Sequence, residues 1–305
     1  MERLGLVGLP NSGKSSLFNA LTGREVTVAS HPFSTTETST GLAQVPDHRL
    51  DALAGMSHSR KVVPASVELV DIAGLVAGAA TGEGLGNRFL GGIREVDALC
   101  LVLRAFEDPE VPGGSDPVED LSVLELELVL SDLDRLETFL ERRRKAARSD
   151  RSLAGEVAAL EAAQVPLAAG TPLYRAGLST ETREALRSSF LLTDKPVLAV
   201  VNLGEDQVDL AEKLVEGVSA ELAGGESGGS GSGGSGSGGS GSGGGGSGGG
   251  EVLGVSVQLE AEAAQLPVGE RSEMLEGLGL GSGALPRVAA AAYHLLGRRT
   301  FLTTG

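Results

Sequence analysis

Aromatic side chains and cysteine are scarce in this chain. Its 305 residues include no tryptophan, two tyrosines and seven phenylalanines. Proteins that bind single-stranded nucleic acids stack the bases on aromatic side chains, so this composition argues against that class. Cys100 is the only cysteine, which excludes an internal disulfide and is typical of a reducing compartment. It lies in the apolar run "ALCLVLRAF", where we expect a buried structural residue.

Long apolar runs and an excess of positive charge are also missing. A membrane-spanning helix needs about 18 consecutive apolar residues; no such run occurs, so we expect no membrane partner and a cytoplasmic location. The net charge of -16 repels a phosphate backbone over most of the surface. We therefore expect no DNA partner, and any RNA contact requires a local basic patch. The hydrophobic content of 41% still suffices for a large, mainly aliphatic core.

Five short runs rich in valine, leucine and isoleucine alternate with helical patterns. They are residues 3–9, 66–72, 98–106, 195–203 and 251–257. Continuous apolar runs of this length are typical of strands that are buried on both faces, as in parallel sheets. The alternation predicts an α/β fold with a doubly wound, mainly parallel sheet.

Residues 116–192 carry no strand pattern and interrupt this alternation. Residues 151–168 form a second helical pattern after a polar break, so we interpret the segment as an inserted helical hairpin. The first helix has leucines at helical spacing: Leu121, Leu124, Leu128, Leu133, Leu136 and Leu140. The basic cluster "ERRRKAARSDR", residues 141–151, falls near the tip. It is either a solvated helix end, where cations are favourable, or a contact with ribosomal or other RNA.

Residues 224–250 contain only glycine, serine and one glutamate. A segment without apolar side chains cannot offset its ordering entropy, so this composition predicts a flexible linker. It is either natural low complexity or an engineered replacement of a loop. In both cases we expect it to carry no chemistry.

The stretch "GLPNSGKS", Gly8–Ser15, directly follows the first predicted strand and precedes a helical pattern. It matches the G-x-x-x-x-G-K-[ST] pattern of a phosphate-binding loop, in which glycines allow backbone N–H groups to face the phosphates. Lys14 is the expected catalytic contact to the β- and γ-phosphates, and Ser15 the expected Mg²⁺ ligand. The candidate nucleotide contacts of this loop are Asn11, Ser12, Gly13, Lys14, Ser15 and Ser16. Removal of a leader would destroy the loop, so we expect no cleaved leader.

Two further segments complete the expected phosphate site. "DIAG", Asp71–Gly74, ends the second predicted strand, which we expect beside the first in either orientation. Asp71 is predicted to hold Mg²⁺ through a water, and the Gly74 N–H to sense the γ-phosphate. In residues 31–38, Thr35 is the first candidate and Thr36 the second to close over Mg²⁺ and the γ-phosphate. Leu75 stands where signalling GTPases carry a water-orienting glutamine, so hydrolysis should be slow or use another group.

The stretch "VNLGEDQ", residues 201–207, holds the position of a base-reading motif but departs from the guanine signature N-K-x-D. Leu203 replaces the lysine and Glu205 the aspartate. The longer glutamate should not superpose on a carboxylate that reads guanine, so we expect weak guanine preference. Asn202 either contacts the base at N7 or braces the phosphate loop. Ser256 and Val257, at the end of the last predicted strand, are candidates for backbone contacts to the base edge.

These motifs occur in an order that resembles the YchF or Obg-like ATPase family of translation-factor-class P-loop NTPases. The segments that carry the resemblance are residues 5–23, 31–36, 67–106, 116–137 and 191–205. The resemblance implies ATP binding in preference to GTP, slow ATP hydrolysis, Mg²⁺ and association with ribosomes or a ribosomal subunit. It also implies that an apolar residue at Leu75 is a family feature. Asn11 matches an asparagine that marks potassium-stimulated relatives, so K⁺ is a further candidate cofactor.

The predicted organisation is a nucleotide-binding domain with two interruptions. Residues 1–115, 193–223 and 251–305 form this domain, residues 116–192 the hairpin and residues 224–250 the linker. The family's third part, a β-grasp domain called TGS, would begin about where the sequence stops; we expect it to be absent, which weakens the expected ribosome contact. The predicted function is an ATP-hydrolysing nucleotide switch. The alternatives are a GTPase with a degenerate base motif and a non-catalytic, nucleotide-gated scaffold.

Overall fold

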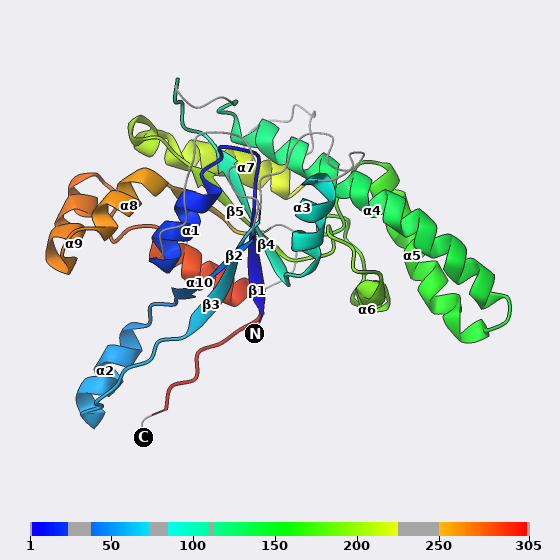
Figure 1. Ribbon diagram of the computed structural model, residues 1–305, viewed down its shortest axis with the longest axis horizontal. Coiled ribbons are helices and arrows are strands. Elements are labelled where there is room, and N and C mark those ends of the chain that lie inside the picture. The colour runs from blue at the N-terminus through cyan, green and yellow to red at the C-terminus, as the bar shows by residue number, and fades with distance from the viewer. Residues whose placement is uncertain (1, 24–37, 73–84, 110–112, 225–249, 304–305) are drawn as a thin grey trace, which may run out of the picture.

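The computed structural model describes residues 2–23, 38–72, 85–109, 113–224 and 250–303. A six-stranded sheet carries helices on both faces, and a long helical arm extends from one side (Figure 1). The strands are β1 (Arg3–Val7), β2 (Ser39–Gln44), β3 (Ser66–Asp71), β4 (Ala98–Arg104), β5 (Val197–Asn202) and β6 (Val252–Val255). The α-helices are α1 (Lys14–Thr22), α2 (His48–Ser57), α3 (Leu85–Arg94), α4 (Pro117–Ala147), α5 (Ala154–Ala168), α6 (Thr180–Leu186), α7 (Ala211–Leu222), α8 (Val257–Ala264), α9 (Val268–Gly277) and α10 (Leu285–Leu295). Short 3₁₀ helices are η1 (Arg151–Leu153), η2 (Arg187–Ser189) and η3 (Glu205–Leu210).

The sheet has the doubly wound order β2-β3-β1-β4-β5-β6. All neighbouring strands are parallel except β2, which is antiparallel to β3. The five apolar runs correspond to β1, β3, β4, β5 and β6, so the predicted fold class is confirmed. Because β1 lies between β3 and β4, the order reverses there, and the loops that follow the parallel strands meet at one edge of the sheet.

Apolar, mainly aliphatic side chains cover both faces of the sheet. Phe18 of α1 and Val288 of α10 lie in the cluster on one face. Ile93 of α3, Leu124 of α4 and Val218 of α7 lie in the cluster on the other. Each of these side chains is at most 1% exposed, and full burial of a large apolar side chain stabilises a fold by about 1.5–3 kcal/mol. The helices are therefore fixed to the sheet that carries the loops.

The arm is the predicted helical hairpin, with α4 and α5 packed together along it (Figure 1). Outer residues of α4, such as Leu136 and Leu140, pack with Leu160 and Leu167 of α5 in a cluster of their own. The first turns of α4 belong instead to the cluster on the sheet. One continuous helix of 31 residues is thus shared by the two cores. The boundaries of the domain, hairpin and linker stay predictions; residues 225–249 lie outside the described residues.

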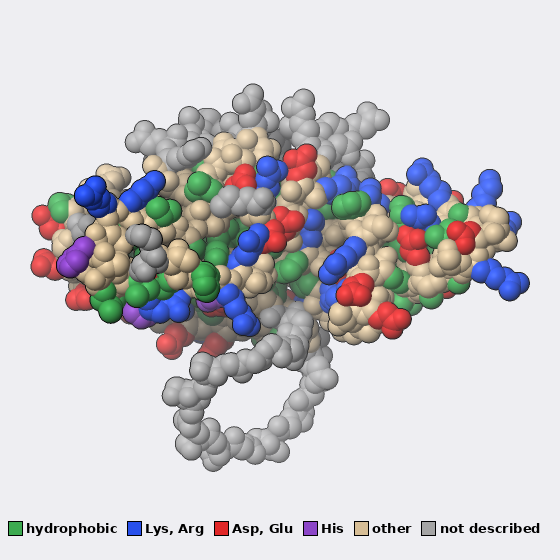
Figure 2. Space-filling model, turned by 90° about the horizontal axis from the view of Figure 1, so that it is seen from below, with side chains coloured by type: hydrophobic (Ala, Val, Ile, Leu, Met, Phe, Trp, Pro, Cys, Tyr) green, Lys and Arg blue, Asp and Glu red, His purple; other side chains and the backbone are tan. Residues whose placement is uncertain are grey.

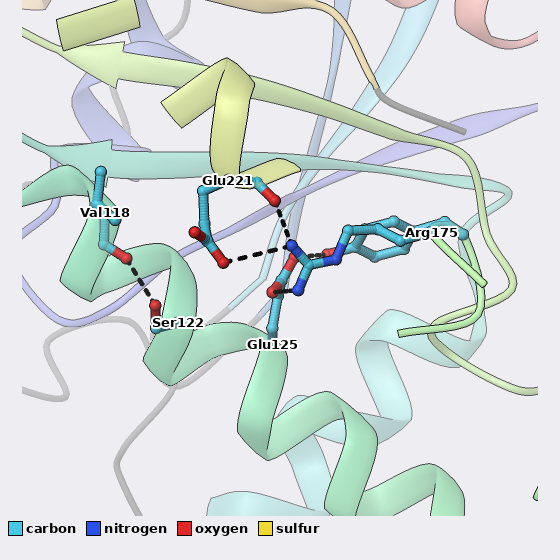
Figure 3. A network of polar contacts seen from close by, with 6 residues as sticks. Val118, Ser122, Glu125, Arg175 and Glu221 are labelled. Atoms are coloured by element: carbon cyan, nitrogen blue, oxygen red, sulfur yellow. Dashed lines mark hydrogen bonds and ion pairs between the residues drawn. The ribbon is translucent and has the colours of Figure 1, made fainter. Parts of the chain in front are cut away.

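A buried polar network holds the root of the arm (Figure 3). The Arg175 guanidinium donates to the Glu125 carboxylate of α4 at 2.6 Å and to the backbone carbonyl of Glu221 at the end of α7. The Tyr174 hydroxyl donates to the second Glu125 oxygen at 2.5 Å. Glu125 is 4% exposed, and burial raises the pKa of its carboxyl. The network therefore joins α4 to α7 in a region where an unpaired charge would be costly.

Two elements at the β2 edge of the sheet, β2 itself and α2, were not predicted. β2 pairs with β3 at the sheet edge, and its side chains alternate between buried and exposed. α2 is preceded by Asp47, whose carboxylate accepts from the Arg49 N–H as an N-cap, and it carries no buried residue. In the part of the chain that the structure describes, no helix combines the length and apolar character that crossing a bilayer would require.

Candidate phosphate-binding site

The loop between β1 and α1 has the backbone of a phosphate-binding loop. A Cβ atom on Gly8 would lie 2.5 Å from the Val102 carbonyl oxygen, and one on Gly13 would lie 2.2 Å from the Asn202 amide nitrogen. Gly13 also has a φ of 91°, and Asn11 a φ of 64°. Only glycine satisfies both constraints at position 13 without strain. α1 then begins with no side-chain cap, so the N–H groups of its first turn, including Ser15 and Ser16, favour an anion.

Lys14 lies beneath this loop and is 7% exposed. Its ammonium donates to the Leu9 carbonyl oxygen at 2.9 Å. Burial lowers the pKa of Lys14 to about 8, and the carboxylates of Asp71 and Asp120 partly oppose that shift. The cation is therefore held next to the loop by a weak neutral partner, which the oxygens of a phosphate can replace.

Asp71 and Ser15 form the candidate magnesium site. β3 runs parallel to β1, with Asp71 opposite Leu6, which settles the strand orientation that the sequence left open. The Ser15 hydroxyl donates to Asp71 Oδ2 at 2.7 Å. Asp71 is 2% exposed, and among the described residues its Oδ1 atom has no hydrogen-bond partner. Burial raises the pKa of this carboxyl. A hydroxyl and a buried carboxylate with a spare acceptor are the oxygen donors that Mg²⁺ prefers, and these residues fit that ion.

Asn202 joins the two sides of the site. It is the last residue of β5 and is 5% exposed. Its amide nitrogen donates to the Ser12 carbonyl oxygen at 3.1 Å, and its amide oxygen accepts from the Val257 N–H at 3.3 Å. Of the two roles considered for Asn202, the structure shows the contact with Ser12 that braces the phosphate loop.

The other base candidates differ in exposure. The Leu203 side chain is 3% exposed and packs in the core beside β6 and α7, while its N–H donates to the Val255 carbonyl. Val257 is likewise buried. Ser256 precedes α8 and is 1% exposed, and its hydroxyl has no hydrogen-bond partner within the described ranges. Glu205 begins η3 and is exposed. Only Glu205 among these presents an exposed side chain, and the contacts of all four with a base stay predictions.

Several predicted residues cannot be placed. Thr35, Thr36, Gly74 and Leu75 lie outside the described residues. Their roles stay predictions.

Two residues around the site, Gln207 and Asp120, escaped sequence reasoning. Gln207 donates to the Ala105 carbonyl at 2.8 Å and accepts from the Gly204 N–H at 2.9 Å, so it braces the base loop. Asp120 of α4 accepts from the Arg104 N–H at 2.9 Å at the end of β4. The contacts of Gln207 with Ala105 and of Asp120 with Arg104 join different elements of the fold, so no local spacing signals them. The one local clue to Asp120 is that an aspartate, and not an apolar residue, precedes Leu121.

Comparison with known proteins agrees with this geometry. A family model described as "50S ribosome-binding GTPase" matches residues 3–136. The "Ribosome-binding ATPase YchF" of Bacillus subtilis is 36% identical over 306 residues, which cover 99% of this chain and 78% of that protein. The protein of the same name from Haemophilus influenzae is 38% identical over 307 residues, with the same coverage.

A solved structure gives the same answer for the fold. The structure of the Schizosaccharomyces pombe YchF GTPase superposes with a TM-score of 0.73 at 29% identity and covers 97% of this chain and 75% of that one. The similarity extends through the phosphate loop, the arm and the base loop alike, because nearly the whole chain is aligned. The chain therefore belongs to the YchF family.

Proposed function

We propose that this protein binds ATP at the loop Gly8–Ser15, hydrolyses it slowly, and acts as a nucleotide-dependent switch associated with the ribosome. The observation that carries the proposal is the convergence of Lys14, Ser15 and Asp71 beneath one phosphate loop. Relatives at 36–38% identity are named ribosome-binding ATPases, which supports ATP as the nucleotide.

The chain's own residues supply binding and charge. Lys14 exchanges its contact with the Leu9 carbonyl for oxygens of the β- and γ-phosphates. Ser15 and Asp71 hold Mg²⁺, the latter through a water; when bound, the ion neutralises charge on the phosphate oxygens. Thr35 and the Gly74 N–H complete the γ-phosphate contacts. Leu75 has no polar group to orient water, so turnover is slow unless Asn11 recruits K⁺ as an additional cation.

Nucleotide choice is the direct test. We expect ATP to bind several-fold more tightly than GTP, because Glu205 is longer than the aspartate that reads guanine. A competition titration measures the ratio, and tighter GTP binding would contradict the proposal. Lys14→Ala should abolish turnover, whereas full activity in this variant would mean that the site lies elsewhere.

A second candidate is GTP hydrolysis with a degenerate base motif, since the S. pombe relative is titled a GTPase. A third is a non-catalytic scaffold, which Leu75 favours. Single-turnover phosphate release with Mg²⁺ and K⁺ separates them. ATP binding without release above background would support the scaffold, and release from GTP alone would support the GTPase.

The tip of the arm is the surface we propose for the ribosome. Figure 2 shows Lys and Arg side chains gathered at that end of the molecule. Glu156 pairs with Arg143 at 3.1 Å and Glu161 with Arg144 at 2.7 Å. Further exposed cations there are Arg142, Lys145, Arg148 and Arg151. This basic patch, on a chain of net charge -16, suits a phosphate backbone better than a protein surface.

Charge reversal tests the ribosomal surface. Arg142→Glu combined with Lys145→Glu should weaken co-sedimentation with ribosomes at least about tenfold and flatten its salt dependence. Arg60→Glu with Lys61→Glu is the matched control, because both residues are exposed on the connection before β3. Equal losses in the two double variants would refute a specific contact by the tip.

A further inference from the structure

Asp120 lies where the arm meets the phosphate site. It belongs to the first turn of α4, whose N-terminus is already capped by Asp116 through the N–H groups of Val118 and Glu119. Asp120 therefore is not needed as a cap. It is 7% exposed, and its neighbours Leu121 and Leu124 are fully buried apolar residues. A carboxylate in such a position is costly unless it is paired, so its contacts require an explanation beyond helix formation.

The Asp120 carboxylate begins a chain of hydrogen bonds that ends in the phosphate loop. Its Oδ2 atom accepts from the N–H of Arg104, the last residue of β4, at 2.9 Å. The next two N–H groups, of Ala105 and Phe106, donate to the Asn202 carbonyl at 2.9 and 3.2 Å. The Asn202 amide then donates to the Ser12 carbonyl at 3.1 Å. A continuous path thus runs from the arm to the loop.

Most residues on this path are nearly inaccessible to water, whereas Phe106 is half-buried. Arg104 is 3% exposed, Asn202 5% and Ser12 1%. Water cannot readily replace a lost bond at these positions, so removal of one partner leaves a buried group unsatisfied. Gly13, which follows Ser12, has no room for even a Cβ atom beside the Asn202 amide. A displacement of Asn202 would therefore be transmitted to the loop.

Electrostatics gives Asp120 a second link to the site. Its carboxylate and that of Asp71 both act through space on the Lys14 ammonium. Asp71 belongs to the nucleotide site itself, whereas Asp120 comes from the inserted arm. The arm thus contributes charge as well as shape to the surroundings of the phosphate-binding cation.

We propose that Asp120 is a positioning residue: it holds the end of β4 and, through Asn202, keeps the Ser12 peptide in the shape that receives the β- and γ-phosphates. This inference rests on the proposed binding of ATP at this loop. Because coupling between two sites is reciprocal, the nucleotide in turn biases the root of α4.

Three substitutions at one position separate hydrogen bonding from charge. Asp120→Asn keeps an oxygen that can accept from the Arg104 N–H, so ATP affinity should stay within about threefold of the parent. Asp120→Ala removes the acceptor and should weaken ATP binding at least about tenfold. Asp120→Glu keeps the charge but displaces the carboxylate by one methylene, and should weaken binding at least about fivefold. The glutamate variant also tests the proposal if the alanine variant does not fold.

Asp116→Ala is the matched control, because it removes a carboxylate four residues earlier whose hydrogen bonds, among the described residues, are those that cap α4. It should lower the unfolding temperature while leaving the ATP dissociation constant within about threefold of the parent. In a double-mutant cycle, the effects of Asp120→Glu and Asn202→Ala on ATP affinity should be non-additive, since both break one path.

The outcomes distinguish this inference from the proposed function. Parent-like ATP affinity in Asp120→Glu, equal losses in Asp120→Asn and Asp120→Glu, additivity with Asn202→Ala, or an equal loss in Asp116→Ala would each overturn the inference. In every such case ATP binding that is lost in Lys14→Ala leaves the proposed function intact. Failure of the parent protein itself to bind ATP would overturn the function.

Discussion

Lys14 illustrates how a single residue can be prepared for a ligand. Its ammonium is buried and donates to the neutral Leu9 carbonyl. Burial disfavours the charged form, whereas two nearby carboxylates favour it, and burial prevails, so the pKa falls to about 8. A polyanion arriving at the loop supplies the opposite charge that this environment lacks.

The pH dependence of binding follows from that pKa. Below pH 8 the free protein already carries the charged Lys14, whereas above it binding must also take up a proton. ATP affinity should therefore fall by up to about tenfold per pH unit above pH 8. Titrations between about pH 7 and pH 9.5 measure this slope. Lys14→Arg, which stays charged, should bind more weakly but with a flat profile; a flat profile in the parent would contradict the assignment.

At the scale of elements, the root of α4 depends on a few buried ionic contacts. The side chains of Glu125 and Arg175 are 5% and 12% exposed, and the same guanidinium reaches the Glu221 carbonyl at the end of α7 (Figure 3). The contacts of Arg144 and Glu161 at the tip of the arm are different, because those side chains are 53% and 47% exposed. Burial makes the two pairs unequal in their effect on folding.

Arg175→Ala should lower the free energy of unfolding by about 3–5 kcal/mol, because it leaves the Glu125 carboxylate buried beside Tyr174 alone. Urea unfolding measures the change. Arg144→Ala serves as the exposed counterpart and should cost about 0–1 kcal/mol. Similar losses of unfolding free energy in the two variants would show that burial does not increase the contribution of the Arg175 network to stability.

The limits of sequence reasoning appear in the same elements. β4 and β5 were predictable because strands that are buried on both faces have unbroken apolar sequences. β2, "STGLAQ", escaped because it lies at an edge and includes glycine and polar residues. Lys14 and Ser15 were found by a local motif, whereas the partnership of Asp120 with Arg104 joins separate elements and has no local signature. The side chain of Leu203 belongs to the core, which its place in a base motif did not suggest.

For the molecule as a whole, Cys100 offers a probe of opening. It lies in β4 and is 0% exposed, and burial raises the pKa of its thiol to about 12. As the only cysteine, it should react with a thiol reagent only when the sheet opens. ATP should slow the labelling of the parent but not of Lys14→Ala, since a ligand stabilises the state that binds it. Rapid labelling under native conditions would contradict the burial of this strand.

The shared helix α4 has a mechanical consequence. With 31 residues and a rise of ~1.5 Å per residue it is a rod of about 46 Å. Its first turns are seated on the sheet near the phosphate loop, and its last turns carry the basic tip. A tilt of about 5° at the seat would swing the far end by about 4 Å. A small displacement of α4 beside the phosphate loop would therefore become a movement about as large as a side chain at the distal end of the arm.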